Sequence, residues 1–210
     1  RSPVNNLLAG KTGIIFGVAN KRSIAWSCAQ SLASQGMRLA FTYMGDRLER
    51  SVRELASELP GSLCLPCDVT RPEQVEEVFR ALKTEFGGLD AIVHAVAFAK
   101  REELQGDFFH TSREGYMIAH EVSAYSLTQI VRTALPLMEG RDGSIAHRIR
   151  TACGAVSDVV THVNVAHGQS ISSRSFLVER ISAHRKLYIE AKRSSAGTCS
   201  SGPKFSKSSV

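Results

Sequence analysis

The stretch Thr12–Ala25, TGIIFGVANKRSIA, decides the fold of this chain. Its apolar part, Thr12–Val18, predicts a buried parallel strand, and a polar turn after Gly17 leads into a helix that begins near Ile24. A strand, a tight glycine turn and a helix N-terminus together form an anion site, because free backbone N–H groups and the helix dipole face one point. The stretch therefore predicts the pyrophosphate-binding turn of a dinucleotide fold.

This turn has fewer glycines than the common dinucleotide-binding fingerprint. Ser23 and Ala25 take later glycine positions, and both are small enough to let a phosphate and a neighbouring strand approach. A single glycine turn after a strand is also typical of an ordinary strand–helix corner, so the interpretation depends on the rest of the chain.

Length and composition predict one α/β domain. The chain has 210 residues, 43% of them hydrophobic and 22% charged, which is ordinary for a globular protein. It shows no apolar run long enough to span a bilayer and no signal-peptide core, so we expect a cytoplasmic protein. The five cysteines include one CxxC, Cys64 and Cys67, where we expect neither metal nor redox chemistry.

Charge is distributed unevenly along the chain. Residues 1–145 hold 16 Lys and Arg and 17 Asp and Glu, a net charge of −1, whereas residues 146–210 hold 10 and 3, a net charge of +7. Such a shift marks a domain boundary, a tail, or a sequence that has lost its original constraints. We expect a dinucleotide-binding, Rossmann-like region over 1–145 and a divergent, basic, Ser-rich C-terminal part of the same domain over 146–210.

Strand and helix patterns alternate through the first region. Alternation implies right-handed crossovers and one parallel sheet covered on both faces, with a ligand beyond the carboxyl ends of the strands. We therefore expect a doubly wound α/β fold. After the first strand, strands are predicted over Arg38–Tyr43, Ser62–Val69, Leu89–Ala99 and from Gly143, and helices over Ile24–Gln35, Asp46–Leu59, Pro72–Phe86 with Thr70 as N-cap, and Thr111–Leu137 with Ser112 as N-cap.

The ends of the predicted strands suit successive parts of a dinucleotide. Gly17 suits the pyrophosphate, Asp68 could accept a hydrogen bond from the adenine amino group, and Val69 could cover its ring. Small residues allow backbone to lie close to the ribose and nicotinamide at the fourth strand end, which consists of Ala95, Val96 and Ala97.

The end of the second strand carries conflicting signals about the ribose. Asp46 and Arg47 come after Tyr43–Met44, where a carboxylate would bind a ribose hydroxyl and an arginine would bind a 2′-phosphate. These residues therefore leave the choice between the two cofactor types open.

Five segments of the first region share one family pattern: GVANKRSIAW, LCLPCDV, GGLDAIVHAVAFA, SREGYMIAHEVSAYSL and PLMEGRDGSI. They resemble the enoyl-acyl-carrier-protein reductases of bacteria and plastids, within the short-chain dehydrogenase/reductase superfamily. The Gly-x5-Ser-Ile-Ala turn separates that family from ordinary members of the superfamily. The resemblance covers about Leu7–Ile145.

The resemblance implies an NADH-dependent enzyme of fatty acid biosynthesis, with NADPH as the other possible cofactor. Its substrate would be a trans-2-enoyl thioester on acyl carrier protein or coenzyme A, and its assembly a homotetramer without a nucleic-acid or membrane partner. By this resemblance Phe98 would approach the acyl pocket. The cofactor contacts implied by it are Gly17, Ser23 and Ile24 at the pyrophosphate, Asp68 and Val69 at adenine, Ala95 and Ala97 along the ribose, and Met44 where the family often has a polar adenine contact.

The family's catalytic pair has no clear counterpart. The family places Tyr-x6-Lys on the helix after strand five, and a further tyrosine at the end of that strand, but this chain continues after Ile145 as AHRIRTACGAV. His147, Arg148 and Arg150 stand where a buried strand should be apolar, and charges left unpaired there would cost several kcal/mol each. A faint register over GAVSDVVTHVNVAHGQS puts Val163 and Ser170 at the tyrosine and lysine positions, so no catalytic residue is assigned.

Another pair has the Tyr-x3-Lys spacing of the wider superfamily. Tyr188 and Lys192 would share a helix face, and Ser175 lies thirteen residues before the tyrosine. Tyr188 nevertheless comes far after Ile145 for the helix that succeeds strand five, so an incidental surface pair is the favoured interpretation. The basic segment Arg180–Arg193 is interpreted as a solvated face rather than a nucleic-acid site.

Three interpretations remain open. The favoured one is an enoyl-thioester reductase whose last third has been altered, for example by a frameshift. The second is a catalytically inactive relative that keeps nucleotide binding. The third is another short-chain reductase that uses Tyr188 and Lys192.

Overall fold

The computed structural model describes residues 6–147, which contain one sheet of five parallel strands in the order β3-β2-β1-β4-β5. This confirms the doubly wound, Rossmann-like α/β fold. The strands are β1 (Thr12–Phe16), β2 (Arg38–Tyr43), β3 (Leu63–Pro66), β4 (Ala91–His94) and β5 (Ser144–His147). The helices are α1 (Ile24–Ala33), α2 (Asp46–Ser57), α3 (Pro72–Phe86), α4 (Arg113–His120) and α5 (Ser126–Met138).

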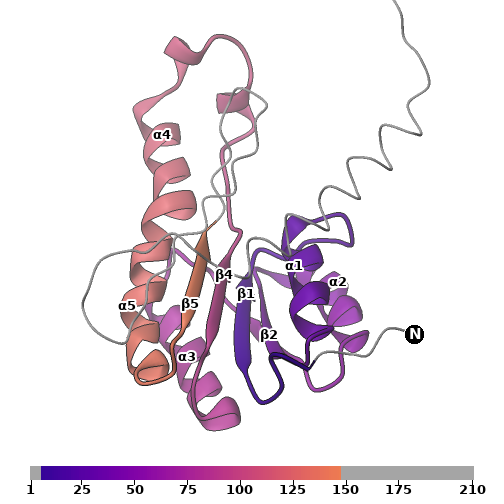
Figure 1. Ribbon diagram of the computed structural model, residues 1–210. Helices are drawn as coiled ribbons and strands as arrows, with labels where there is room; N and C mark the ends of the chain where they lie inside the picture. Colours follow the sequence, from indigo (N-terminus) through magenta and orange to yellow (C-terminus); the bar gives the residue numbers. More distant parts are fainter. Residues whose placement is uncertain (1–5, 148–210) are drawn as a thin grey trace, which may run out of the picture. The chain divides into compact units, whose positions relative to one another are not determined.

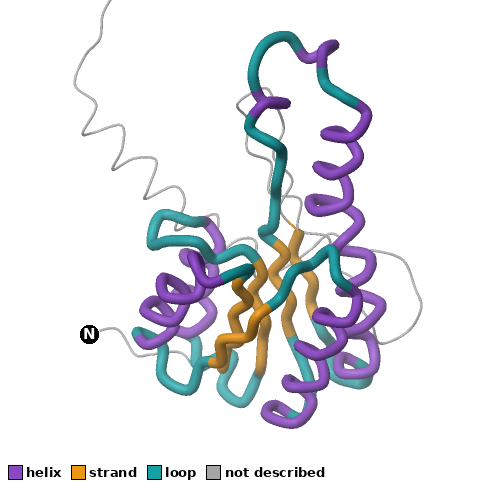
Figure 2. The backbone as a smooth tube through the Cα atoms, turned by 180° about the vertical axis from the view of Figure 1, so that it is seen from behind, coloured by secondary structure: helices purple, strands orange, loops and turns teal. Residues whose placement is uncertain are grey.

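Helices cover both faces of the sheet. Helices α1 and α2 lie on one side and α3 and α5 on the other (Figure 1, Figure 2). Trp26 of α1 packs on Phe41 of β2, with ring centroids 6.1 Å apart, while Phe79 of α3 packs on Phe16 of β1 at 6.5 Å. All four rings are buried, and burial of such side chains contributes roughly 1.5–3 kcal/mol each.

The predicted long helix over Thr111–Leu137 consists of three parts. Helix α4 is succeeded by a π-helical turn (Glu121–Tyr125), which continues directly into α5. Ser112 is the N-cap, as predicted, because its hydroxyl accepts a hydrogen bond from the N–H of Gly115. A Cβ at Gly115 would meet the carboxyl group of Glu103, which also binds Ser112, so a larger residue here would displace that side chain.

Helix α4 extends beyond the carboxyl ends of the strands, together with the loop that leaves β4 (Figure 1). This loop contains two 3₁₀ turns, Glu102–Leu104 and Phe108–His110. Within residues 6–147, no helix is both long and apolar enough to cross a membrane.

Several predicted boundaries were wrong. Strand β4 ends at His94 rather than Ala99, because its neighbour β1 pairs only as far as Phe16, whose carbonyl accepts the N–H of Ala95. Strand β3 covers only Leu63–Pro66, and β1 ends at Phe16. The N-cap of α3 is Arg71 and not Thr70, whose hydroxyl instead donates to Asp68.

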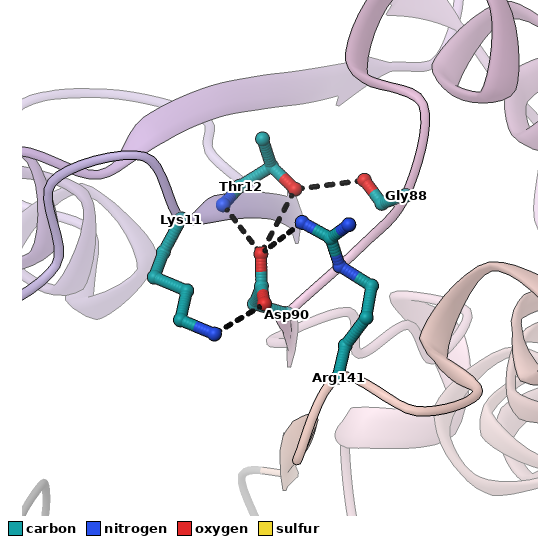
Figure 3. A network of polar contacts seen from close by, with 5 residues as sticks. All are labelled: Lys11, Thr12, Gly88, Asp90 and Arg141. Carbon is teal, nitrogen blue, oxygen red and sulfur yellow. Dashed lines mark hydrogen bonds and ion pairs between the residues drawn. The ribbon is translucent and has the colours of Figure 1, made fainter.

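A buried carboxylate fixes the amino ends of the central strands (Figure 3). Asp90, just before β4, has a side chain only 6% exposed and accepts hydrogen bonds from the backbone N–H of Thr12 at 2.9 Å and from the Lys11 ammonium at 2.9 Å. Arg141, ahead of β5, donates to the same carboxylate at 3.0 Å. One side chain therefore joins β1, β4 and the segment that leads into β5.

The charge of this carboxylate is stabilised by its partners. Burial alone would raise the pKa of Asp90, but hydrogen bonds from Arg141, Thr12 and Lys11 outweigh it and hold that pKa below its usual value. The carboxylate of Asp90 is thus ionised near neutral pH, and its two ion pairs, with Arg141 and with Lys11, are both formed there.

A second buried polar network joins the carboxyl ends of β4 and β5. His94 is fully buried, and its Nδ1 lies 2.9 Å from Nδ1 of His147, while its Nε2 lies 2.9 Å from the hydroxyl of Ser126. The Ser126 hydroxyl donates to the carbonyl of Val122 at 2.6 Å. It must therefore accept from Nε2–H of His94, which leaves Nδ1 of His94 to accept from Nδ1–H of His147.

This hydrogen-bond order requires His94 to be neutral, because its Nδ1 must accept while its Nε2–H donates. Burial lowers the pKa of His94 to about 4, helped by the neighbouring His147, and burial also lowers the pKa of His147. The sequence-based expectation of an uncompensated charge in strand five was therefore wrong for His147. Arg148 and Arg150, which raised the same expectation, lie outside the described residues.

We predict that Asp90→Asn lowers the free energy of unfolding by about 3 kcal/mol, because the amide leaves two cations without a buried counter-charge. Urea unfolding followed by circular dichroism at pH 7 measures the change. Asp142→Asn is the matched control, since Asp142 is exposed and its φ of 51° suits asparagine. Equal stability of the Asp90 and Asp142 variants would contradict the assigned role of the network.

We also predict that acid destabilises the fold through the histidine pair. Between pH 6.5 and pH 5 the unfolded chain binds a proton at His94 that the folded chain does not bind. The free energy of unfolding therefore decreases as the pH is lowered, by up to about 1.4 kcal/mol per pH unit for each such histidine. The contribution of His94 is complete above its unfolded pKa and lost as pH falls toward about 4.

The pH dependence is measured from urea unfolding at several pH values in the wild type and in His94→Asn. The variant should show a smaller slope over pH 5–6.5, a range above most carboxylate titrations. His110→Asn, at an exposed position, should retain the wild-type slope. An unchanged slope in His94→Asn contradicts the prediction.

Candidate functional site

The carboxyl edge of the sheet brings together the strand ends that the sequence singled out. The strand order places the ends of β3, β2, β1 and β4 next to one another along this edge. In an open α/β sheet this is the edge at which ligands bind. The candidate site is therefore this row of four strand ends.

Gly17 follows β1 and lies in close contact with the segment that leaves β4. Its φ is +95°, and a Cβ at this position would overlap the carbonyl oxygen of Ala95 and lie 2.6 Å from its carbonyl carbon. It would also lie 3.0 Å from the backbone nitrogen of Val96. A glycine is thus needed for the approach of two backbones, in addition to any role toward a phosphate.

The turn after Gly17 presents the N-terminus of α1. Ser23 is its N-cap: the hydroxyl accepts from the N–H of Trp26 at 3.2 Å and donates to the carbonyl of Asn20 at 2.7 Å. The N–H groups of Ile24 and Ala25 precede the first intrahelical donor and find no acceptor within the part of the chain that the structure describes. Two free donors and the helix dipole can bind an anion here.

The end of β2 is organised by a buried tyrosine. The Tyr43 hydroxyl donates to the carboxylate of Glu49 at 3.0 Å, and Arg53 binds both the carboxylate, at 2.7 Å, and the phenol oxygen, at 3.2 Å. Burial and the contact with Glu49 raise the pKa of Tyr43, while the hydrogen bond from Arg53 lowers the pKa of Glu49. Met44 comes next with 56% of its surface exposed, so it is accessible at this edge.

Asp68 and Val69 lie just past the end of β3. One carboxylate oxygen of Asp68, Oδ1, accepts from both the N–H and the hydroxyl of Thr70, at 3.0 and 2.7 Å. The other, Oδ2, has Arg71 at 3.8 Å as its one neighbour among residues 6–147, and retains acceptor capacity for a ligand. Val69 is mostly buried and packs in the core beneath this edge.

The segment after β4 passes along the same edge. Ala95 and Val96 are partly buried, and Ala97 is exposed. Phe98, with 48% of its surface exposed, is fixed through its backbone, whose N–H donates to the Ser123 hydroxyl at 3.1 Å. Sequence reasoning did not identify Ser123, because its partner is 25 residues away and is a backbone group.

Other candidate residues do not form a site. Burial raises the pKa of Cys64 and raises the pKa of Cys67 to about 12, so both thiols are unreactive at neutral pH. His110 contacts Phe109, and His120 stacks on Tyr116. Among residues 6–147, no three His, Cys, Asp or Glu side chains are grouped as metal ligands would be.

Several residues considered for catalysis lie outside the described residues. These are the tyrosine and lysine positions of the family register and the rival pair with its serine: Val163, Ser170, Ser175, Tyr188 and Lys192. The basic segment Arg180–Arg193 also lies there.

Comparison with known proteins identifies one family. The family model for enoyl-(acyl carrier protein) reductase matches residues 17–177, which include the Gly17 turn and continue beyond Ile145, where the sequence motifs ended. The chain is 51% identical to the NADH-type enoyl-[acyl-carrier-protein] reductase FabI of Bacillus cereus over 134 residues, 63% of this chain and 52% of that protein.

Solved structures agree with this match. The B. cereus reductase with NADP⁺ and indole naphthyridinone has a TM-score of 0.61 at 51% identity, over 63% of this chain and 52% of that one. The enoyl-[acyl-carrier-protein] reductase (NADH) of Aquifex aeolicus has a TM-score of 0.68 at 38% identity, over 89% and 70%.

The chain spans about half the length of the curated relatives that it matches most strongly. Within the matched part, the parallel sheet, the glycine-poor turn and the small residues after β4 occur in the order that the resemblance predicted. The chain belongs to the enoyl-(acyl carrier protein) reductase family of the short-chain dehydrogenase/reductase superfamily.

Proposed function

We propose that this protein is an enoyl-[acyl-carrier-protein] reductase of fatty acid biosynthesis that uses NADH. The observation that carries the proposal is the pair of free N–H groups at Ile24 and Ala25 beside the Gly17–Ala95 contact, inside the region that matches the family. Free N–H donors at a helix N-terminus after a glycine turn are the groups that bind a diphosphate, and this supports the proposal.

The residues present fit a dinucleotide. Gly17, Ser23 and Ile24 would hold the diphosphate, through backbone donors and the capped helix end. The free oxygen of Asp68 would accept from the adenine amino group, with Val69 beneath the ring and Met44 at its exposed side. The ribose and nicotinamide would lie along three small residues, Ala95, Val96 and Ala97.

The edge beside Met44 supports either nicotinamide cofactor. Asp46 and Arg47 are both exposed at the start of α2. The names of the B. cereus and A. aeolicus relatives specify NADH, whereas the solved B. cereus structure contains NADP⁺. We propose NADH as the cofactor, with NADPH as a weaker alternative.

When bound, the cofactor supplies a hydride to the β-carbon of a trans-2-enoyl thioester. The backbone of Ala95–Ala97 would orient the nicotinamide side, and Phe98 would border the acyl chain. The thioester oxygen becomes negative as the reaction proceeds, and it needs a hydrogen-bond or proton donor. We assign no described side chain to that role, because the family's tyrosine and lysine positions fall at Val163 and Ser170.

The remaining parts of the proposal derive from the family. The substrate thioester is carried on acyl carrier protein or coenzyme A, and the protein acts in the cytoplasm as a homo-oligomer, a tetramer by resemblance. Size-exclusion chromatography with light scattering reports the assembly directly.

The proposed activity predicts that the chain oxidises NADH when crotonyl coenzyme A or a longer enoyl thioester is added. Without the family's general acid, the rate should be lower than that of a full-length relative by about 10²–10⁴. Absorbance at 340 nm, with product identified by mass spectrometry, measures the reaction.

Each other result supports a different interpretation. Cofactor binding without any product indicates the inactive nucleotide-binding relative. Loss of activity in Tyr188→Phe indicates the reductase that uses Tyr188 and Lys192. Absence of NADH binding contradicts the proposal itself, and turnover as fast as in the full-length relative contradicts the absence of the general acid.

We predict that Gly17→Ala weakens NADH binding at least ten-fold, because the added Cβ pushes the Ala95 backbone out of the cofactor path. Fluorescence titration of NADH measures the affinity. Gly140→Ala is the matched control: its φ is +70°, so it carries the same backbone strain, but no atom lies within 4 Å of its added Cβ. The control should lose stability and keep its affinity for NADH.

A further inference from the structure

A pair of serines holds the segment that leaves β4. Ser123 lies in the π-helical turn and Ser126 begins α5, three residues later. Ser126 contacts the side chain of His94, the last residue of β4, whereas Ser123 contacts the backbone of Phe98. The two ends of the segment His94–Phe98 are thus attached to one short stretch of helix.

The Ser123 hydroxyl satisfies both backbone groups of one residue. It accepts from the N–H of Phe98 at 3.1 Å and donates toward the carbonyl oxygen of Phe98 at 3.4 Å. Beyond the end of β4, no neighbouring strand within residues 6–147 forms backbone hydrogen bonds with Phe98. The side chain of Ser123 forms these hydrogen bonds instead. The serine therefore extends the fixed part of the chain four residues past His94.

The π-helical turn interrupts the regular helix at this point. Its extra residue changes the direction of the side chains after it, and such turns are frequent at functional sites. Helix α4 before it is attached to the loop through Lys100 and Glu114, 2.6 Å apart, and through Glu103 and Ser112. These contacts hold the distal loop, whereas Ser123 alone binds the backbone at Phe98 within residues 6–147.

The opposite side of the segment is held by β1. The N–H of Ala95 donates to the carbonyl of Phe16 at 3.0 Å, and Gly17 packs directly on the Ala95 backbone. Between these attachments and Ser123, the carbonyl of Ala95 and the backbone groups of Val96 and Ala97 have no hydrogen-bond partner among the described residues. The segment is therefore fixed on both sides, with its small residues left at the edge.

We propose that Ser123 is a positioning residue for the cofactor: its hydroxyl fixes Phe98, and thereby sets where the backbone of Ala95–Ala97 lies against the nicotinamide half of the dinucleotide. This proposal rests on the proposed function. Ser123 need not contact the ligand itself. Its role is to fix the backbone that forms the carboxyl edge of the sheet, where the cofactor would bind.

The test compares three variants of the full chain. Ser123→Ala removes the hydroxyl and should raise the dissociation constant for NADH about five- to ten-fold. Ser123→Thr keeps a hydroxyl and should restore most of the affinity. Ser57→Ala is the matched control, because Ser57 is an exposed helical serine whose hydroxyl binds only the Glu54 carbonyl among the described residues, and it should change nothing.

Amide hydrogen exchange at Phe98, followed by NMR, gives a second readout that needs no cofactor. Exchange should accelerate at least ten-fold in Ser123→Ala and return toward the wild-type rate in Ser123→Thr. If the wild-type chain does not bind NADH, the proposed function fails, and exchange at Phe98 alone decides whether Ser123 holds the segment.

Three outcomes overturn the proposal. One is an unchanged dissociation constant in Ser123→Ala, and another is unchanged exchange at Phe98. The third is equal loss of affinity in the alanine and threonine variants, which would assign the effect to packing of the π-helical turn rather than to the hydroxyl.

Discussion

The pairing of β1 with β4 is the constraint on which the rest of the structure depends. It joins the two halves of the doubly wound sheet, and it is secured at each end by a different kind of interaction. At the amino end the Asp90 carboxylate binds the backbone of Thr12 directly. At the carboxyl end Gly17 admits the Ala95 backbone at a distance that no side chain would allow. Because both ends are fixed, the strand ends that face a ligand keep one spacing.

The amino and carboxyl ends of the strands differ in the kind of groups that they carry. The amino edge contains partly buried ion pairs, in which Lys11 and Arg141 share the buried carboxylate of Asp90. Such a cluster stabilises only when all partners are present, because a buried charge without a partner is costly. At the carboxyl edge, small side chains and the free N–H groups of α1 remain available instead. Because the charged network and the proposed ligand edge lie at opposite ends of the strands, we expect substitutions at one to affect stability and substitutions at the other to affect affinity.

Much of the fold, and part of the site, could be predicted from local sequence patterns. Alternating apolar strands and capped helices predicted the parallel sheet, and Ser112 acts as the expected cap. The missed features depend on contacts between distant residues. The strand Leu89–Ala99 looked continuous because its apolar run outlasts the strand that pairs with it, and Asp90 was included in that strand with no partner assigned to it. His147 looked misplaced because its partner, His94, is 53 residues away. Ser123 binds a backbone group, which no pattern of side chains reveals.

The glycine-poor turn is explained by where backbone meets backbone. At Gly17 an added Cβ would meet another main chain, so this position of the turn requires glycine. Ser23 uses its hydroxyl to cap α1, which a glycine could not do, and Ala25 is buried against the core. The later glycines of the common fingerprint are replaced by residues that stabilise the helix end while leaving its N–H groups free. The proposed cofactor edge therefore depends on the position of the backbone, which Gly17 sets beside the proposed diphosphate position and Ser123 sets at Phe98, beside the proposed nicotinamide position.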